Sequence, residues 1–147
     1  MPPFARLVVP DAVLADVVQH ARRDAPVECC GLLAGHIAAC EGRVTARFPI
    51  ANVLRSPTDY LTEPHEMLRA FRAMRAAGLE LLAIYHSHPT SAPVPSARDI
   101  AGNSYGESVP HVIVSLAGEA AAVRAWWLTD TGCREAGAIE AVGRITG

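Results

Sequence analysis

Apolar residues in the first third of the chain fall into two patterns, short continuous runs and runs with helical spacing. The spacing of apolar residues between Asp11 and Pro26 predicts a helix, preceded by a short strand-like run at 7–9. The compact apolar run 29–37 is short enough to be a buried strand. Residues 43–52 alternate loosely and end in a polar loop, so we expect them to form the second strand of a hairpin.

The middle of the chain predicts a second helix followed by a buried strand. Pro64 suits a first helical turn, and Gly78 lies at a C-terminal cap position. The expected apolar stripe of this helix consists of Met67, Leu68, Phe71 and Met74. The continuous apolar run 81–85 is typical of a central strand covered on both faces. Two further strand candidates follow at 112–116 and 121–128.

Together these elements predict the fold class. Strands mixed with two or three helices indicate an α/β or α+β fold with a largely central sheet. The sequence has no internal repeat and no low-complexity linker, so we expect a single domain over residues 1–147. The tail from Gly132 has no clear pattern and is left unassigned.

Composition and charge exclude several classes of protein. Half of the 147 residues are hydrophobic and 19% are charged, which indicates a folded chain with a real core. The net charge of -2 offers no basic excess for binding nucleic acid. All 13 basic residues are Arg, so Schiff-base and phosphate-loop lysines are absent.

The cysteines and the N-terminus bear on the compartment. The chain has four cysteines: Cys29, Cys30, Cys40 and Cys133. None forms a C-x-x-C pair, and we expect all four to be small buried hydrophobes in a reducing compartment. Asp11 and Asp16 interrupt the N-terminal apolar patch, and no run reaches the ~18 apolar residues of a membrane span. The sequence predicts a cytoplasmic protein without a membrane partner.

Two histidines and an aspartate have the pattern of a metal site. His86 and His88 are one residue apart at the end of the expected buried strand, so both imidazoles project from the same face. After Pro89 the chain runs to Ser96 and Asp99, which mark a helix start. Two imidazoles and one carboxylate are a standard open zinc set, which leaves a fourth position for water. The pattern therefore predicts a catalytic zinc, whose bound water is a nucleophile near neutral pH.

A zinc hydrolase also needs a base that is not a ligand, and Glu28 is the best candidate. It precedes the apolar run 29–37, where burial would raise the pKa of its carboxyl group. That Glu28 lies near His86 in space is an inference. The sequence spacing does not show it.

Simpler interpretations exist for each residue taken alone. Ser96 and Asp99 form a capping-box pattern, and either His86 or His88 could be an ordinary core histidine. Their combined spacing should arise by chance on the order of once per 2,000 such chains, which favours the metal site. The remaining histidines are assigned no role: His20 and His65 are expected at the surface of helices, whereas His36 and His111 flank strands.

The sequence resembles the JAMM (MPN-type) zinc metalloproteases. Their signature is an upstream Glu, then H-[ST]-H-P, then S-x-x-D, and here it reads VECCGLLAG followed by HSHPTSAPVPSARD. The E-C-C-G-L-L-x-G run and Y-H-S-H-P are particularly similar to the small bacterial members. The similarity covers most of the chain, including the order of its helices.

The resemblance implies a fold and a role for each motif residue. The fold would be a curved mixed β-sheet flanked by helices, of the cytidine-deaminase-like kind, with the metal near the end of the strand that carries His86. His86, His88 and Asp99 would bind one Zn²⁺ per chain. Glu28 would deprotonate the zinc-bound water and pass the proton to the leaving amine. Ser96 would help to hold the oxyanion.

The resemblance also suggests a substrate. Compact bacterial members are associated with ubiquitin-like sulfur-carrier proteins whose tails end in Gly-Gly, and they cleave the bond after that tail. We therefore expect this chain to act on such a carrier, as in releasing cysteine from a carrier–cysteine adduct. The leaving group, the metal used in the cell and the oligomeric state stay open, with a homodimer as one option.

Four alternative classes of protein can be compared with this sequence. RadC-type proteins of DNA metabolism share a related motif, and Pro93 and Pro95 resemble theirs. A non-catalytic MPN scaffold would bind protein partners with the same fold. Non-heme iron oxygenases also use two histidines and a carboxylate, but their acid stands where this chain has His88. Zinc deaminases need a P-C-x-x-C segment, which is missing.

Overall fold

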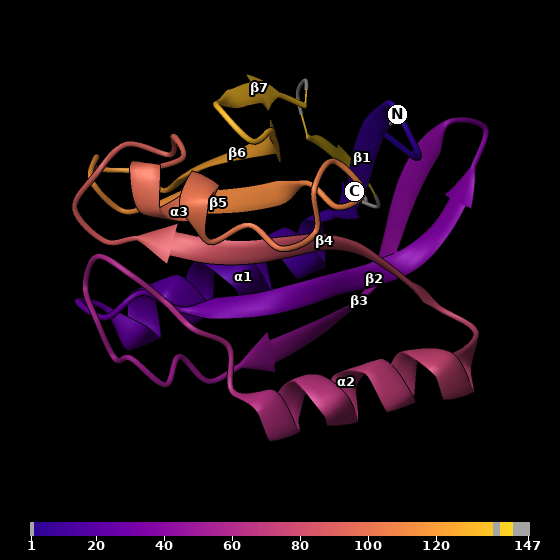
Figure 1. Cartoon of the computed structure of the whole chain (residues 1–147), viewed down its shortest axis with the longest axis horizontal. Helices are drawn as coiled ribbons and strands as arrows, with labels where there is room; N and C mark the ends of the chain where they lie inside the picture. Colours follow the sequence, from indigo (N-terminus) through magenta and orange to yellow (C-terminus); the bar gives the residue numbers. More distant parts are fainter. Residues whose placement is uncertain (1, 137–138, 143–147) are drawn as a thin grey trace, which may run out of the picture.

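The structure is a computed structural model that describes residues 2–136 and 139–142. Within these residues the chain forms one eight-stranded sheet and three helices (Figure 1). The strands are β1 (Arg6–Pro10), β2 (Cys30–Ala38), β3 (Glu41–Ile50), β4 (Glu80–His88), β5 (His111–Ser115), β6 (Ala122–Leu128), β7 (Cys133–Glu135) and β8 (Glu140–Val142). The helices are α1 (Asp11–Asp24), α2 (Pro64–Ala77) and α3 (Ala97–Ala101).

The sheet is mixed, as expected from the resemblance. Its strand order is β7-β6-β5-β4-β2-β3-β1-β8. β2 and β3 form an antiparallel hairpin, and β4 pairs antiparallel with β2 and parallel with β5. The register of β2 shifts on both sides of Ala34, and such bulges bend a strand and increase its twist. The pairing places β4 at the centre of the sheet, covered by a strand on each edge.

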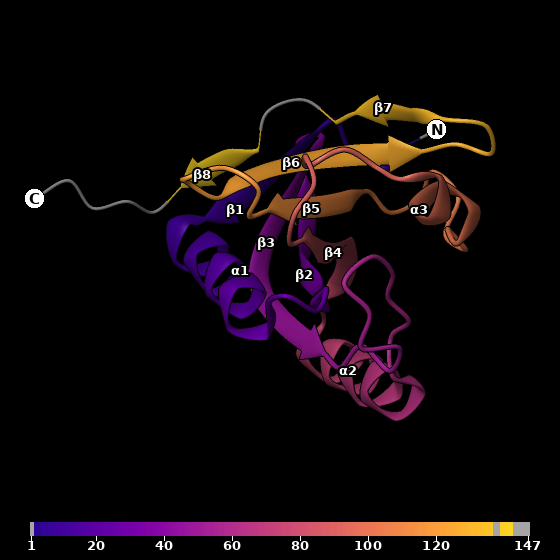
Figure 2. The same cartoon turned by 90° about the vertical axis from the view of Figure 1, so that its left-hand side faces the viewer.

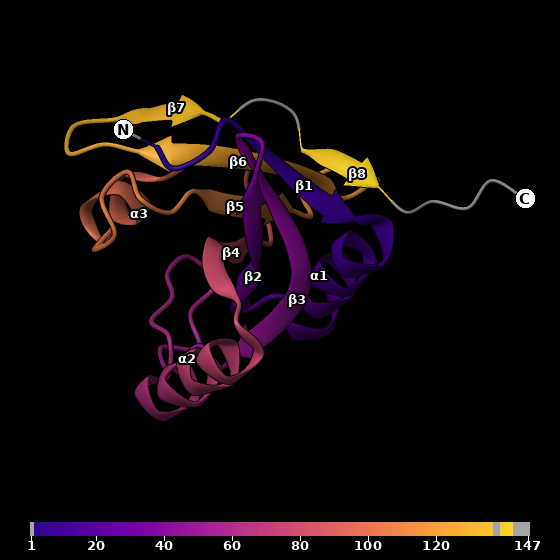
Figure 3. The same ribbon diagram turned by 90° about the vertical axis from the view of Figure 1, so that its right-hand side faces the viewer.

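Two layers of apolar side chains lie on the two faces of the sheet. Successive residues of β2 point to opposite faces, so Leu33 packs in the cluster that contains Val17 of α1, whereas Leu32 packs in the cluster that contains Met74 of α2. Figure 2 and Figure 3 show α1 and α2 on either side of β2 and β3. This arrangement explains why the run 30–35 is apolar throughout, as predicted for a buried strand.

The ends of α2 are as predicted, but its buried face is not. Pro64 stands in the first turn, and Gly78 adopts the left-handed conformation with φ of 70° at the C-terminal cap. The buried residues of this helix are Ala70 and Met74, whereas the expected stripe residues Leu68 and Phe71 are 49% and 37% exposed. The surface of the helix that is buried against the sheet is therefore narrower than the apolar stripe expected from the sequence.

Two further expectations about single residues are wrong. His20, expected at the surface, is buried, because its Nδ1 lies 2.7 Å from the Tyr85 hydroxyl on β4 and its Nε2 pairs with Asp24. Cys29 and Cys30 are buried as predicted, but Cys40, in the turn between β2 and β3, and Cys133, the first residue of the edge strand β7, are exposed. The unassigned tail contributes β7 and β8, although residues 137–138 and 143–147 lie outside the described part. None of the described helices is long and apolar enough to cross a membrane.

Candidate metal centre

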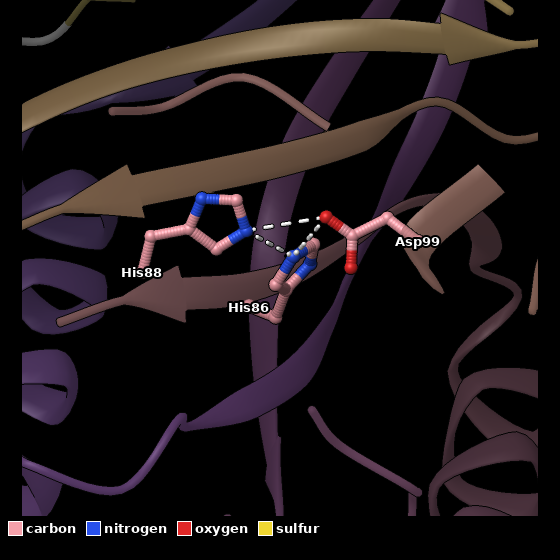
Figure 4. A group of neighbouring side chains, drawn as sticks. All are labelled: His86, His88 and Asp99. Carbon is pink, nitrogen blue, oxygen red and sulfur yellow. Dashed lines mark hydrogen bonds and ion pairs between the residues drawn. The ribbon is translucent and has the colours of Figure 1, made fainter. Parts of the chain in front are cut away.

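The two motif histidines stand at the C-terminal end of the central strand. His86 and His88 are both on β4 and, with one residue between them, their rings project from the same face (Figure 4). Their Nε2 atoms are 3.1 Å apart. His86 pairs with Cys30 on one side and Ile113 on the other, and it is fully buried. The strand therefore presents two imidazole nitrogens at one fixed point.

Asp99 reaches the same point from α3. Its Oδ2 lies 3.2 Å from the Nε2 of both histidines. A capping box fixes the carboxylate, because the Ser96 hydroxyl accepts from the Asp99 N–H at 3.1 Å and the Ser96 N–H donates to Asp99 Oδ2 at 2.8 Å. Ser96 and Asp99 thus form the helix cap, and the same cap holds the Asp99 carboxylate at the candidate metal site.

The donor set fits a zinc ion. Zinc bonds of about 2.0–2.1 Å in tetrahedral geometry place ligand atoms about 3.3 Å apart, close to the 3.1–3.2 Å found here. His88 Nδ1 donates to the Ala92 carbonyl at 2.8 Å, which leaves the lone pair of a neutral His88 Nε2 facing the Asp99 carboxylate. Two acceptors this close need a positive charge between them, which a proton on His88 or a bound metal ion would supply.

The electrostatics of the site also suit metal ligation. Burial lowers the pKa of His86, which keeps the imidazole neutral as a ligand must be. Burial alone would raise the pKa of Asp99, but hydrogen bonds from His86 and His88 outweigh it and hold that pKa well below its usual range. His88 differs from His86: burial alone would lower its pKa, but its hydrogen bonds to Asp99 and to the Ala92 carbonyl outweigh burial and raise it. A metal ion at this point would therefore displace a proton from His88.

Glu28 lies in the cleft beside these residues. It lies two residues before β2 and is 4% exposed. Together with His88 and Ser96 it lines a cleft that we call the base cleft. Its Oε1 has no hydrogen-bond partner among the described residues. Burial raises the pKa of this carboxyl group to about 8. A buried oxygen without a partner is the atom that a water in the cleft would satisfy.

Backbone hydrogen bonds from distant segments fix the position of Glu28. Its N–H donates to the Ser56 carbonyl at 2.9 Å, and its carbonyl accepts from Asn52 Nδ2 at 3.0 Å. The next N–H, of Cys29, donates to the hydroxyl of Ser87 at 2.8 Å. Ser87 stands between the two motif histidines, so β4 holds both the imidazoles and the segment that carries the acid.

A second cleft, lined by Asp99 itself, contains residues to which the sequence pattern assigned no role. We call it the tyrosine cleft, and it is lined in part by Tyr60, Arg98, Asn103 and His111. Tyr60 stacks on His86 with ring centroids 4.6 Å apart. His111 is buried, and its Nε2 lies 3.2 Å from Asn103 Oδ1.

These missed residues differ in how far a sequence pattern could have indicated them. His111 is brought to the site by the parallel pairing of β5 with β4, in which it lies opposite Ile84. The spacing of residues in the sequence does not indicate such a pairing. Tyr60 and Asn52 belong to the loop between β3 and α2, and nothing in their local pattern singles them out. Only Arg98 carried a signal, because it directly precedes a motif residue.

The roles of the motif residues come from the resemblance, and the structure brings all of them together. The potential ligand atoms of His86, His88 and Asp99 lie close together, and Glu28 and Ser96 line the adjoining base cleft. Ser96 accepts a hydrogen bond from the backbone in its capping role, which leaves its own O–H able to donate.

Comparison with protein families places this site in context. Residues 10–129, which include all five motif positions, match the family described as prokaryotic homologs of the JAB domain. A "Probable TtuB-protein conjugate cleaving protease" of Thermus thermophilus is 41% identical over 125 residues, covering 84% of this chain and 77% of that protein.

Two further relatives are shorter matches. A "Desampylase" of Haloferax volcanii is 41% identical over 90 residues, covering 60% of this chain and 63% of that protein. A "CysO-cysteine peptidase" of Mycobacterium tuberculosis is 39% identical over 94 residues, covering 64% of this chain and 63% of that protein. The chain thus matches just under two thirds of the length of these two relatives.

Solved structures agree on the fold. The solution structure of a protein from Desulfitobacterium hafniense has a TM-score of 0.81 and 28% identity, and the match covers 92% of this chain and 91% of that one. A protein from Salinibacter ruber has a TM-score of 0.68 and 27% identity, covering 91% and 90% of the two chains.

Proposed function

The chain belongs to the prokaryotic homologs of the JAB domain, and on that premise we propose that it is a zinc metallopeptidase. Its substrate is a ubiquitin-like or sulfur-carrier protein, and it hydrolyses the peptide or isopeptide bond after the Gly-Gly tail. One observation carries the proposal. His86, His88 and Asp99 converge within 3.2 Å of one another while the unpaired carboxylate oxygen of Glu28 lies in the adjoining cleft.

Each residue has a role that follows from its position. His86, His88 and Asp99 would hold the ion, which when bound supplies a Lewis acid that makes water acidic near neutral pH. Glu28 takes a proton from the attacking water and returns it to the leaving amine, so one carboxylate serves as base and then as acid. The Ser96 hydroxyl donates a hydrogen bond to the carbonyl oxygen as negative charge develops there.

The environment of Glu28 suits this proton transfer. A general base works best with a pKa near the operating pH, and burial brings the pKa of Glu28 to about 8. A base must also be held in place, and three hydrogen bonds from distant segments hold the backbone at residues 28 and 29.

The relatives support the class of substrate. Their printed names describe cleavage of TtuB conjugates, desampylation and cleavage of CysO-cysteine. These names share a small carrier protein on one side of the scissile bond. They differ in the leaving group, which is a protein in some and a single amino acid in another.

The test is a Glu28→Gln variant assayed beside the wild type. Removing a general base costs typically 10²- to 10⁴-fold in rate, so we expect turnover of a carrier–cysteine adduct to fall by at least about 10²-fold. Elemental analysis should still find one zinc per chain. Glu119→Gln, at an exposed turn, is the matched control and should retain full activity.

A scaffold that only binds partners makes the opposite prediction. It would show no turnover in the wild type and no difference between the two variants. Full activity of Glu28→Gln would contradict the assigned base, whereas loss of zinc from this variant would point to a ligand role for Glu28.

A further inference from the structure

Arg98 occupies an unusual place in the site. It stands next to Asp99 in α3, and it lines both the base cleft and the tyrosine cleft. It is the only arginine among the described residues that line either cleft. A substrate group in either cleft would therefore lie near the same guanidinium.

Arg98 forms no salt bridge with a carboxylate among the residues that the structure describes, although its charge acts on the neighbouring Glu28 carboxyl group. Its Nη1 donates one hydrogen bond, at 3.0 Å, to the neutral Thr58 hydroxyl. By contrast, Arg124 on the far strand β6 donates two bonds to the Glu135 carboxylate, at 2.9 and 2.7 Å. A guanidinium has five N–H donors, and Arg98 is exposed, so most of its donors face the clefts or solvent.

The single bond to Thr58 also limits where the guanidinium can go. Thr58 belongs to the loop between β3 and α2, and it lines the base cleft with Glu28. The Arg98 side chain therefore bridges from α3 to this loop, next to the acid. A planar donor group held in this way suits a planar anion such as a carboxylate, which it can bind through two parallel bonds.

The chemistry of the leaving group decides whether an anion arrives at this point. When a single amino acid follows the Gly-Gly tail, its α-carboxylate is separated from the scissile nitrogen only by Cα. When the tail is joined to a lysine side chain of a protein, no charge lies near that nitrogen. A cation beside a metal ligand is therefore useful for an amino-acid leaving group and has no partner in an isopeptide.

From these observations we infer that Arg98 binds the α-carboxylate of a leaving group that is one free amino acid. The inference rests on the proposed function and names its substrate class: a carrier protein extended by one residue after Gly-Gly. In the reaction, water adds to the carbonyl carbon and the C–N bond breaks. The carrier regains its Gly carboxylate, and the amino acid leaves with its amine and its carboxylate intact.

The first experiment compares two carriers that differ in one group. Both end in Gly-Gly-Ala, one with a free carboxylate and one with a carboxamide, because alanine has no thiol to bind the metal. We expect the wild type to prefer the acid roughly 10- to 100-fold in kcat/KM. Arg98→Gln should lose that preference, mainly through KM, so that acid and amide are cleaved with similar kcat/KM. Arg98→Lys should recover part of it, since an ammonium keeps the charge without the planar fork.

A second readout does not need turnover. Binding of short Gly-Gly-Ala peptides, acid and amide, is measured by calorimetry on the zinc-loaded Glu28→Gln protein and on its Arg98→Gln double variant. The acid should bind more tightly than the amide only where Arg98 is present. Arg72→Gln, on the exposed face of α2, is the matched control and should change neither readout.

The outcomes separate this inference from the proposed function. Equal cleavage and equal binding of acid and amide, unchanged in Arg98→Gln, would overturn the role of Arg98 while leaving a peptidase. Faster cleavage of a lysine-linked conjugate than of the acid would overturn it as well. Tighter binding of the acid without any turnover by the wild type would support the carboxylate site and reject the peptidase.

Discussion

At the scale of single residues, the Glu28 carboxyl group links the site to the stability of the fold. Burial raises its pKa from an ordinary value of 4.5 to about 8. Between these two values the unfolded chain has lost the proton and the folded chain retains it. The folded state therefore loses stability relative to the unfolded state as pH rises through this window, with the full loss reached above the folded pKa.

This linkage predicts a pH-dependent difference between two proteins. In the metal-free state, the free energy of unfolding of the wild type should fall relative to Glu28→Gln between pH 5 and pH 8.5, by up to a few kcal/mol. Urea unfolding in the presence of a chelator measures it, and the other titrating groups cancel in the difference. A difference that is the same at both pH values would show that Glu28 is solvated in the folded protein.

The residues that sequence reasoning found and missed differ in how they reach the site. His86, His88 and Asp99 could be predicted because strand alternation and a helix cap operate within a few residues. The nearness of Glu28 depends on the pairing of Cys30 with His86, so spacing could only suggest it. His20 was misplaced for the same reason, since its burial depends on Tyr85, far along the chain.

At the scale of elements, the loop between β3 and α2 is organised by one side chain. Asn52 Nδ2 donates to the carbonyls of Glu28 and Asp59, and Asn52 Oδ1 accepts from the N–H groups of Leu54 and Leu61. All four of its hydrogen-bonding positions are used. The loop then supplies the residue that stacks on His86, so one amide connects the acid, the loop and the imidazole.

Asn52→Asp should therefore slow the reaction without removing the metal. The aspartate keeps both accepted bonds but loses both donated ones, leaving the Glu28 carbonyl without its partner, at a cost of about 1–3 kcal/mol in unfolding free energy. We expect kcat to fall at least tenfold with zinc content unchanged and KM affected less, as measured by steady-state kinetics. Gln19→Glu, at an exposed position on α1, controls for the added charge. Unchanged kcat would show that the loop does not position the acid.

Most elements themselves could be predicted, because their signals are local. Proline and glycine mark the ends of α2, and the continuous apolar run marks the buried part of β2. The buried face of α2 could not be predicted, because the spacing of apolar residues does not reveal how wide the contact with the sheet is. Ala70 is buried there because a small residue allows the helix to lie close, and Phe71 is left partly exposed beside it.

At the scale of the whole molecule, metal binding and folding should be coupled. A ligand that binds only the folded state stabilises it by RT ln(1 + [L]/Kd), about 2.7 kcal/mol at 100 times Kd. We expect zinc to raise the unfolding temperature and a chelator to lower it, as measured by scanning calorimetry. His88→Ala should abolish the response to zinc, whereas His65→Ala, at an exposed position on α2, should preserve it. An identical response in both variants would exclude this site as the one that zinc occupies.

The three candidate metal ligands all come from the continuous stretch 86–99, whereas the candidate base comes from residue 28 on the other side of a strand pairing. A single mutation at residue 28 could therefore remove catalysis and leave the candidate metal ligands unchanged. If the proposed function holds, a duplicated gene that loses only the acid would encode a decoy, which would keep its fold and its three candidate ligands and compete with the active copies for substrate. This architecture gives evolution a one-step route from an enzyme to its own antagonist.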